Sequence, residues 1–203
     1  MIAIVDYGMG NLRSVRKGLE KAGADARVTT AAQDLRDAAG IVLPGVGAFA
    51  AAAHNLRASG LDTVILDEIK KGKPFLGICL GLQMLFEYGE EGEGAEGFGL
   101  FKGRVIRFTH DLKVPHMGWN QLQFVNRGPV GQDIPENTFV YFVHSYHVAP
   151  EDESIVMAKT EYGYEFVSAI TKDNITACQF HPEKSQAWGL KMLENFGRAV
   201  KAG

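Results

Sequence analysis

Cysteine, proline and long apolar runs are all scarce in this sequence. Its 203 residues include two cysteines and seven prolines, which excludes a disulfide-built scaffold and a proline-rich extended chain. No apolar run is long enough to span a membrane. The N-terminal segment MIAIVDYG has neither a basic leader nor a small-residue cleavage site, so we expect a strand there and not a signal peptide.

An excess of positive charge is also absent. The formal net charge is −3, and a chain without a basic surface has no electrostatic footprint for nucleic acid. We therefore expect no nucleic-acid partner and no membrane partner. The two cysteines, Cys79 and Cys178, form no disulfide framework, which favours a reducing, cytoplasmic setting.

Apolar strands alternating with helices make up the first half of the chain. Leu12, Val15 and Leu19 recur at helical spacing, and the run 48–71 is helical with a break near Ser59–Gly60. We expect strands at 2–6, 25–30, 40–44 and 73–79, and helices at 11–24, 31–38, 48–71 and 80–89.

The pattern changes after an acidic, glycine-rich stretch at 90–99, which we expect to be a loop. The second half predicts strands at 103–108, 121–125, 139–148, 154–160, 166–170 and 175–180, and a closing helix at 185–203. The sequence therefore predicts one α/β domain over residues 1–203. Its central sheet should be open and mostly parallel, with helices on both faces and an added antiparallel portion.

The stretch GICLG (77–81) places a cysteine between two glycines, after an apolar strand and before a predicted helix. This is the setting of a nucleophile elbow, a strained turn with no room for side chains two positions away. The helix N-terminus would favour the thiolate of Cys79, and the N–H of Leu80 is free to donate to an oxyanion. A buried core thiol is the alternative, and Cys178, without flanking glycines, fits that description.

A cysteine nucleophile needs a base, and His181 in QFHPEKS directly follows a predicted strand. Pro182 keeps the segment extended, so Glu183 points the same way as His181 and can orient its imidazole. Sites in open parallel sheets lie at the carboxyl ends of strands, where both Cys79 and His181 are placed. The pattern therefore favours a catalytic triad over a surface turn with a chance histidine and glutamate.

A third segment, LPGVGAF (43–49), also follows an apolar strand. Val46 and Gly47 carry N–H groups in a loop that can aim them, so either could be a second oxyanion donor; a tight turn without chemistry is the alternative. Two other patterns are weaker. His144 and His147 have a metal-ligand spacing without a supporting cluster, and DYGMGN (6–11) lacks the spacing and lysine of phosphate loops. We expect no metal and no cofactor.

Taken together, PGVG, GICLG and HPEK resemble the class I, triad-type glutamine amidotransferases, in which loop, cysteine, histidine and glutamate follow in this order. VPHMGWN (114–120), DYGMGN and HSY (144–146) are similar to the glutaminase subunits of imidazole glycerol phosphate synthase, in histidine biosynthesis. The resemblance covers essentially the whole chain. It implies a class I amidotransferase fold and hydrolysis of L-glutamine to glutamate and ammonia.

The resemblance also implies roles for individual residues. Cys79 would attack the substrate amide, His181 oriented by Glu183 would move protons, and backbone N–H groups would hold the oxyanion. The oxyanion donors would be Leu80 with Val46 or Gly47. The expected substrate contacts are Gln83, Glu91 for the α-amino group, and His144, Ser145 and Tyr146 for the α-carboxylate.

Family members pass ammonia to a partner, a cyclase subunit with a (β/α)8-barrel fold that forms imidazole glycerol phosphate and AICAR. The resemblance therefore implies a heterodimer with an ammonia channel. Trp119 is expected in an exposed loop facing the partner, with core packing as the alternative. The expected interface residues are Asn11, His116, Met117, Gly118, Trp119, Asn120, Tyr141 and Lys184.

Three other functions stay open on the sequence. Another triad amidotransferase subunit, serving GMP, anthranilate, carbamoyl phosphate or pyridoxal phosphate synthesis, would share the chemistry, although PHMGWN argues against it. A cysteine peptidase or γ-glutamyl hydrolase could use the same elbow. A flavodoxin-like binding module would have no reactive cysteine.

Overall fold

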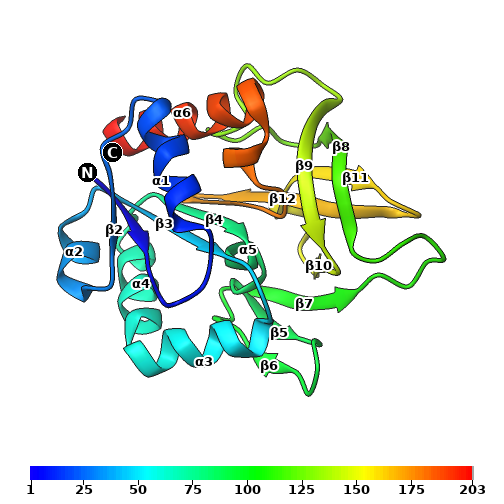
Figure 1. The fold of residues 1–203 in the computed structure, drawn as a ribbon, viewed down its shortest axis with the longest axis horizontal. Helices are drawn as coiled ribbons and strands as arrows, with labels where there is room; N and C mark the ends of the chain where they lie inside the picture. The colour runs from blue at the N-terminus through cyan, green and yellow to red at the C-terminus, as the bar shows by residue number, and fades with distance from the viewer. Residues whose placement is uncertain (203) are drawn as a thin grey trace.

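Five parallel strands form the centre of the fold in the computed structural model, which describes residues 1–202 (Figure 1). Their order is β2-β1-β3-β4-β13, and each neighbouring pair is parallel. Strands β1, β3 and β4 are short apolar runs, as expected of strands covered on both faces, whereas the edge strand β2 carries the exposed Arg27. Their bounds are β1 Ile2–Val5, β2 Ala26–Thr29, β3 Gly40–Gly45, β4 Phe75–Cys79 and β13 Ile175–Cys178.

Helices cover both faces of this parallel region because successive strand residues point to opposite sides. Val42 of β3 joins an apolar cluster with α1 and α6, whereas Ile41 and Leu43 join one with α2, α3 and α4. Figure 1 shows α1 and α6 together on one side and α3 and α4 on the other. The helices are α1 Leu12–Lys21, α2 Ala32–Asp37, α3 Phe49–Ser59, α4 Leu61–Lys70 and α6 Gln186–Ala202.

The remaining strands are mainly antiparallel and extend the sheet beyond β13. The path continues through β12 Glu165–Lys172, β10 Tyr146–Pro150, β7 Phe101–Arg107, β5 Phe86–Gly89 and β6 Ala95–Glu96. A branch leaves β12 through β11 Val156–Glu161, β8 His116–Phe124 and β9 Thr138–His144. The prediction of a mostly parallel centre with helices on its faces and an antiparallel addition is confirmed.

The helix predicted over 80–89 is wrong beyond its first turn. Helix α5 covers only Leu80–Gln83, and the chain then becomes extended as β5. The carbonyls of Met84 and Phe86 accept hydrogen bonds from the 98–99 backbone instead of from the next helical turn. Gly97 allows this approach because a Cβ there would overlap the Phe86 carbonyl oxygen. The segment before Gly97 also pairs with β5 and forms the short strand β6, inside the stretch 90–99 that was predicted as a loop.

The strand predicted over 139–148 is two strands with a break at Ser145. Strand β9 pairs with β8, whereas β10 pairs with β7 and β12. The chain therefore passes from the branch to the main sheet at this point. PHMGWN is also not an exposed loop, because residues 116–120 belong to β8. Within residues 1–202, none of the helices is long and apolar enough to cross a membrane.

Candidate functional site

Cys79 occupies a strained turn between β4 and α5. Its φ is 56°, in a region that non-glycine residues rarely adopt and that costs about 1–3 kcal/mol. A Cβ on Gly81 would overlap the Leu43 carbonyl oxygen, and one on Gly77 would lie 2.8 Å from the Gly81 carbonyl oxygen. The two glycines therefore leave the space that the turn needs, as the nucleophile elbow requires.

His181 and Glu183 lie beside this turn, after β13. The imidazole Nδ1 of His181 is 2.8 Å from Glu183 Oε1, and both side chains are buried. Burial lowers the pKa of His181, but Cys79 and Glu183 outweigh it and raise the pKa to about 9. Because Glu183 holds Nδ1, the contact with Cys79 that helps raise this pKa falls to the other ring nitrogen, Nε2, which has no other hydrogen-bond partner among residues 1–202. The three predicted triad residues are thus brought together.

The PGVG loop lies next to the elbow. Gly45 pairs with Cys79 in the parallel register of β3 and β4, which places Val46 and Gly47 over the same cavity as Leu80. Gly47 has a φ of 106°, and a Cβ there would lie 2.8 Å from the Met9 Cε atom. The loop therefore holds two backbone N–H groups close to the nucleophile.

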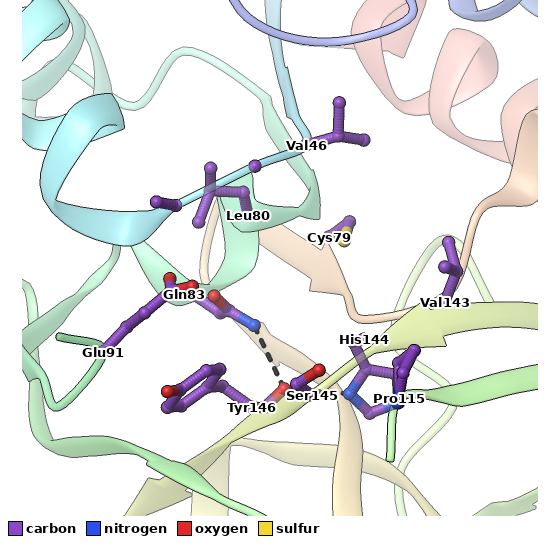
Figure 2. A pocket seen from close by; sticks show the side chains of 12 residues that line it. Val46, Cys79, Leu80, Gln83, Glu91, Pro115, Val143, His144, Ser145 and Tyr146 are labelled. Atoms are coloured by element: carbon purple, nitrogen blue, oxygen red, sulfur yellow. Dashed lines mark hydrogen bonds between the residues drawn. The ribbon is translucent and has the colours of Figure 1, made fainter. Parts of the chain in front are cut away.

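A cavity of about 440 Å³ opens at the Cys79 sulfur (Figure 2). Four segments build most of it, namely the PGVG loop, the elbow, the loop between β5 and β6, and the junction between β9 and β10, and Pro115 completes the lining. All five residues predicted to contact substrate line it, namely Gln83, Glu91, His144, Ser145 and Tyr146. His181 and Glu183 are not among the lining residues. The break at Ser145 carries the chain directly into the cavity wall.

Glu91 reaches this wall from a loop far away in the sequence. Its Oε2 accepts a hydrogen bond of 2.8 Å from the N–H of Phe49, the first residue of α3. Ala48, at the cap position, has no side chain that could do so, and a carboxylate at a helix N-terminus is electrostatically favourable. The helix thereby fixes a carboxylate at the edge of the cavity.

One functional candidate, Gln179, was missed by the sequence reasoning. Its Nε2 lies 3.5 Å from the Cys79 sulfur, and its Oε1 accepts from Gln83 Nε2 at 3.1 Å. Gln83 Nε2 also donates to the Tyr146 carbonyl at 3.1 Å (Figure 2). A signal was present in QFHPEKS, because Gln179 precedes His181 by two residues and an extended segment turns both the same way.

Residues 3–200 match the family model for class-I glutamine amidotransferases. This chain belongs to that family. Among curated proteins, it is 52% identical to the imidazole glycerol phosphate synthase subunit HisH of Syntrophotalea carbinolica, over 97% of this chain and 99% of that protein. The HisH subunit of Aquifex aeolicus is 54% identical, over 98% of this chain and 96% of that protein.

Solved structures show the same amidotransferase fold at low identity. A crystal structure of a glutamine amidotransferase has a TM-score of 0.76 at 18% identity, covering 97% of this chain and all of that chain (100%). The structure of PurLQS from Thermotoga maritima has a TM-score of 0.71 at 19% identity, covering 99% and 97%. At these identities the likeness concerns the fold alone.

In this amidotransferase, the residues predicted at the partner interface fall into two groups. Trp119 and Tyr141 are cross-strand partners with ring centroids 6.0 Å apart, and the Lys184 ammonium lies 5.9 Å from the Tyr141 ring. Met117 (61% exposed) and Trp119 (45% exposed) point outward from β8. This cluster therefore presents aromatic and cationic groups on one face.

The second group faces inward or lies elsewhere. His116 is 3% exposed and turned into the protein, and Asn120 donates to its Nε2 at 3.2 Å. Gly118, between the outward-pointing Met117 and Trp119, is partly buried. Asn11 caps α1 by accepting from the Ser14 N–H. As for metals, residues 1–202 bring together no group of three histidine, cysteine or carboxylate side chains that could hold one.

The inward-facing histidines of the amidotransferase have defined proton positions. The Tyr146 carbonyl can only accept, so its 2.8 Å contact requires a proton on His144 Nδ1. Burial lowers the pKa of His144 to about 3 and that of His116 to about 4, so both rings are neutral. His144 Nε2 must then accept from His116 Nδ1, 3.0 Å away.

Proposed function

We propose that this chain is the glutaminase subunit of an imidazole glycerol phosphate synthase. It hydrolyses L-glutamine to glutamate and ammonia, and ammonia passes to a cyclase subunit that forms imidazole glycerol phosphate and AICAR. The observation that carries the proposal is the cavity at Cys79, whose side chain contacts the buried His181–Glu183 pair. The HisH relatives, at about half identity over almost the full chain, support the choice of subunit.

The first half of the reaction forms a thioester. The thiolate of Cys79 attacks the side-chain amide carbon, and the carbonyl oxygen becomes an oxyanion. We assign this oxyanion to the N–H of Leu80 and that of Val46 or Gly47, because all three residues line the same cavity. His181 carries a proton on Nε2 and gives it to the departing nitrogen, so that ammonia leaves and a glutamyl thioester remains on Cys79.

The second half releases glutamate. Neutral Nε2 of His181 accepts a proton from water, whose oxygen attacks the thioester carbon, and the sulfur leaves as a thiolate. Glu183 holds Nδ1 protonated throughout, which keeps Nε2 directed at the sulfur and stabilises the imidazolium. An amide is a poor electrophile, so the reaction needs both a strong nucleophile and stabilisation of the oxyanion.

The cavity wall also suits the zwitterionic end of glutamine. We place the α-amino group at the Glu91 carboxylate, which lines the cavity from the loop between β5 and β6 (Figure 2). We place the α-carboxylate at the backbone of Ser145 and Tyr146, in the junction itself. This arrangement favours free glutamine over an internal peptide residue, which has no free amino or carboxylate group.

For the partner, we propose a (β/α)8-barrel cyclase docked on the face that carries Met117, Trp119, Tyr141 and Lys184. Aromatic side chains and methionine are enriched where proteins bind one another, and Trp119 and Met117 are both exposed on this face. We place the complex in the cytoplasm, where a catalytic thiol stays reduced; both cysteines are free.

Glutamine hydrolysis by the chain with and without the cyclase subunit tests this function. We expect little glutamate from the chain alone, and at least a roughly tenfold increase when the cyclase and its nucleotide ligand are present, a typical coupling between two sites. A matched mixture with the partner of another amidotransferase should give no increase. Full turnover by the isolated chain would contradict the coupling, and the absence of glutamate under every condition would contradict the function.

A further inference from the structure

The Cys79 sulfur has a second polar neighbour besides His181. The carboxamide of Gln179 is completely buried (0% exposed), and its Nε2 lies 3.5 Å from the sulfur. A buried amide N–H needs an acceptor, because leaving it unpaired costs about 1–3 kcal/mol. The sulfur is the acceptor that the fold offers to this N–H.

The direction of this hydrogen bond follows from one main-chain carbonyl. The Tyr146 oxygen can only accept, so the Gln83 atom that faces it at 3.1 Å must be the nitrogen Nε2. The same Nε2 has a second proton, and it points to a Gln179 atom 3.1 Å away, which must be the oxygen. Gln179 therefore turns its own nitrogen toward Cys79.

A flip of either carboxamide would break this arrangement at once. Turning Gln83 over would set its oxygen against the Tyr146 oxygen, and turning Gln179 over would set an oxygen against the sulfur. The Tyr146 carbonyl has two lone pairs and is also held by His144 Nδ1 at 2.8 Å. One carbonyl thus fixes the orientation of both amides, which lie in a buried part of the protein.

We propose that Gln179 is a further catalytic residue, whose side-chain N–H donates to the sulfur of Cys79 and stabilises its thiolate, with Gln83 and the Tyr146 carbonyl as positioning groups. This inference rests on the proposed function. The donor acts when the thiolate attacks the amide and again when the sulfur leaves the thioester carbon. In the thioester the sulfur is neutral and a weak acceptor, so the N–H favours the charged states on either side of it.

The pH dependence of Cys79 alkylation by iodoacetamide tests this role in the full-length chain. In Gln179→Met, which keeps the length but lacks the donor, we expect the pH midpoint of alkylation to rise by about one unit and the rate at neutral pH to fall about tenfold. Gln179→Glu, with a carboxylate facing the sulfur, should show a larger shift. Unchanged midpoints in folded variants would overturn the proposal.

Asn195→Leu is a matched control. Asn195 is also a buried carboxamide (3% exposed), but it donates to the carbonyls of Val130 and Gln132. This variant should lose stability and keep the alkylation midpoint of the wild type. If the control shifts equally, the effect in Gln179→Met reflects general loosening and the proposal is wrong.

The wild-type protein offers a second readout that needs no folded variant. In protein whose glutamine residues are labelled with 15N, the NMR signal of the Gln179 side-chain amide should move when Cys79 is alkylated, because the thiolate acceptor is lost. An unmoved signal would overturn the proposal. The role of Gln179 and the proposed function can be rejected separately. If the wild type hydrolyses glutamine and Gln179→Met keeps the wild-type pH profile of alkylation, only the role of Gln179 is rejected.

Discussion

Two buried cysteines end neighbouring parallel strands, and their chemical environments differ. Cys79 ends β4 and Cys178 ends β13, with exposed fractions of 7% and 5%. Burial therefore does not distinguish them. Cys79 has a φ of 56° and opens onto the cavity, whereas Cys178 has ordinary strand geometry and pairs with Ile78 in register.

The environment of Cys178 keeps its thiol protonated. Burial raises the pKa of Cys178 well above its usual range, and the charges of Glu183 and Cys79 raise it further. Its S–H donates to the Phe180 carbonyl at 3.4 Å. The comparison teaches that the turn, and not the depth, decides which thiol can meet a substrate.

The largest expected difference between the two cysteines appears when each sulfur is removed in turn. We expect Cys79→Ala to lower glutamine hydrolysis by at least about 10⁴-fold, because no nucleophile remains. Cys178→Ala should keep the rate within about threefold, since losing a small buried group costs stability of roughly 1 kcal/mol. The measurement is glutamate release by the complex. Ammonia-driven product formation should survive in both variants, and its loss in Cys79→Ala would contradict separate glutaminase and synthase sites.

The glycines around Cys79 provide the next test, because Thr176 and Phe180 occupy the equivalent positions around Cys178. Gly81→Ala should lower the free energy of unfolding by about 3 kcal/mol or more, since its Cβ would overlap the Leu43 carbonyl oxygen. Gly197 lies within α6, and a Cβ there would only touch the Ala24 Cβ at 3.4 Å. Gly197→Ala should therefore stabilise the protein by up to about 1 kcal/mol, because alanine has the higher helix propensity. Urea unfolding measures both, and equal effects would argue against a crowded elbow.

The charge of Glu183 raises the pKa of both Cys178 and His181, and its removal should give the smallest of the expected effects. The folded-state pKa of His181 is raised from 6.5 to about 9. Protonated His181 therefore contributes fully to the free energy of unfolding below pH 6.5, and this contribution is lost as the pH rises through 9. Glu183→Gln should reduce this loss by on the order of 1 kcal/mol, as measured by urea unfolding from pH 6.5 to above 9. The exposed Glu151→Gln is the control, and identical pH slopes for both variants would refute the coupling.

Much of the fold was predictable because periodicity carries the information. The buried strands β1, β3 and β4 are continuous apolar runs, and α1 has a clear apolar stripe. The change from α5 to β5 was not predictable, because residues 84–89 are apolar enough for either state. Backbone hydrogen bonds from 97–101 decide it, and these form only once the loop has docked.

The site divides in the same way. Cys79, His181 and Glu183 were found because each has a local signature in a glycine pair, a strand end or a spacing of two. Gln179 was missed because its only local signal is its spacing of two from His181, and its contact with the sulfur forms only through the β4–β13 pairing. The inward orientation of His116 could have been predicted from a strand over residues 116–120, because successive strand residues point to opposite faces. The prediction of a loop there left this alternation out.

The Tyr146 carbonyl belongs to the main chain, so any residue type at position 146 would supply it. The direction of the hydrogen bonds that reach the sulfur is therefore encoded in the path of the backbone, and side-chain comparisons between homologues would not detect it. Anyone transplanting this thiol site into a designed scaffold would need to reproduce the strand break at Ser145 as well as the catalytic side chains.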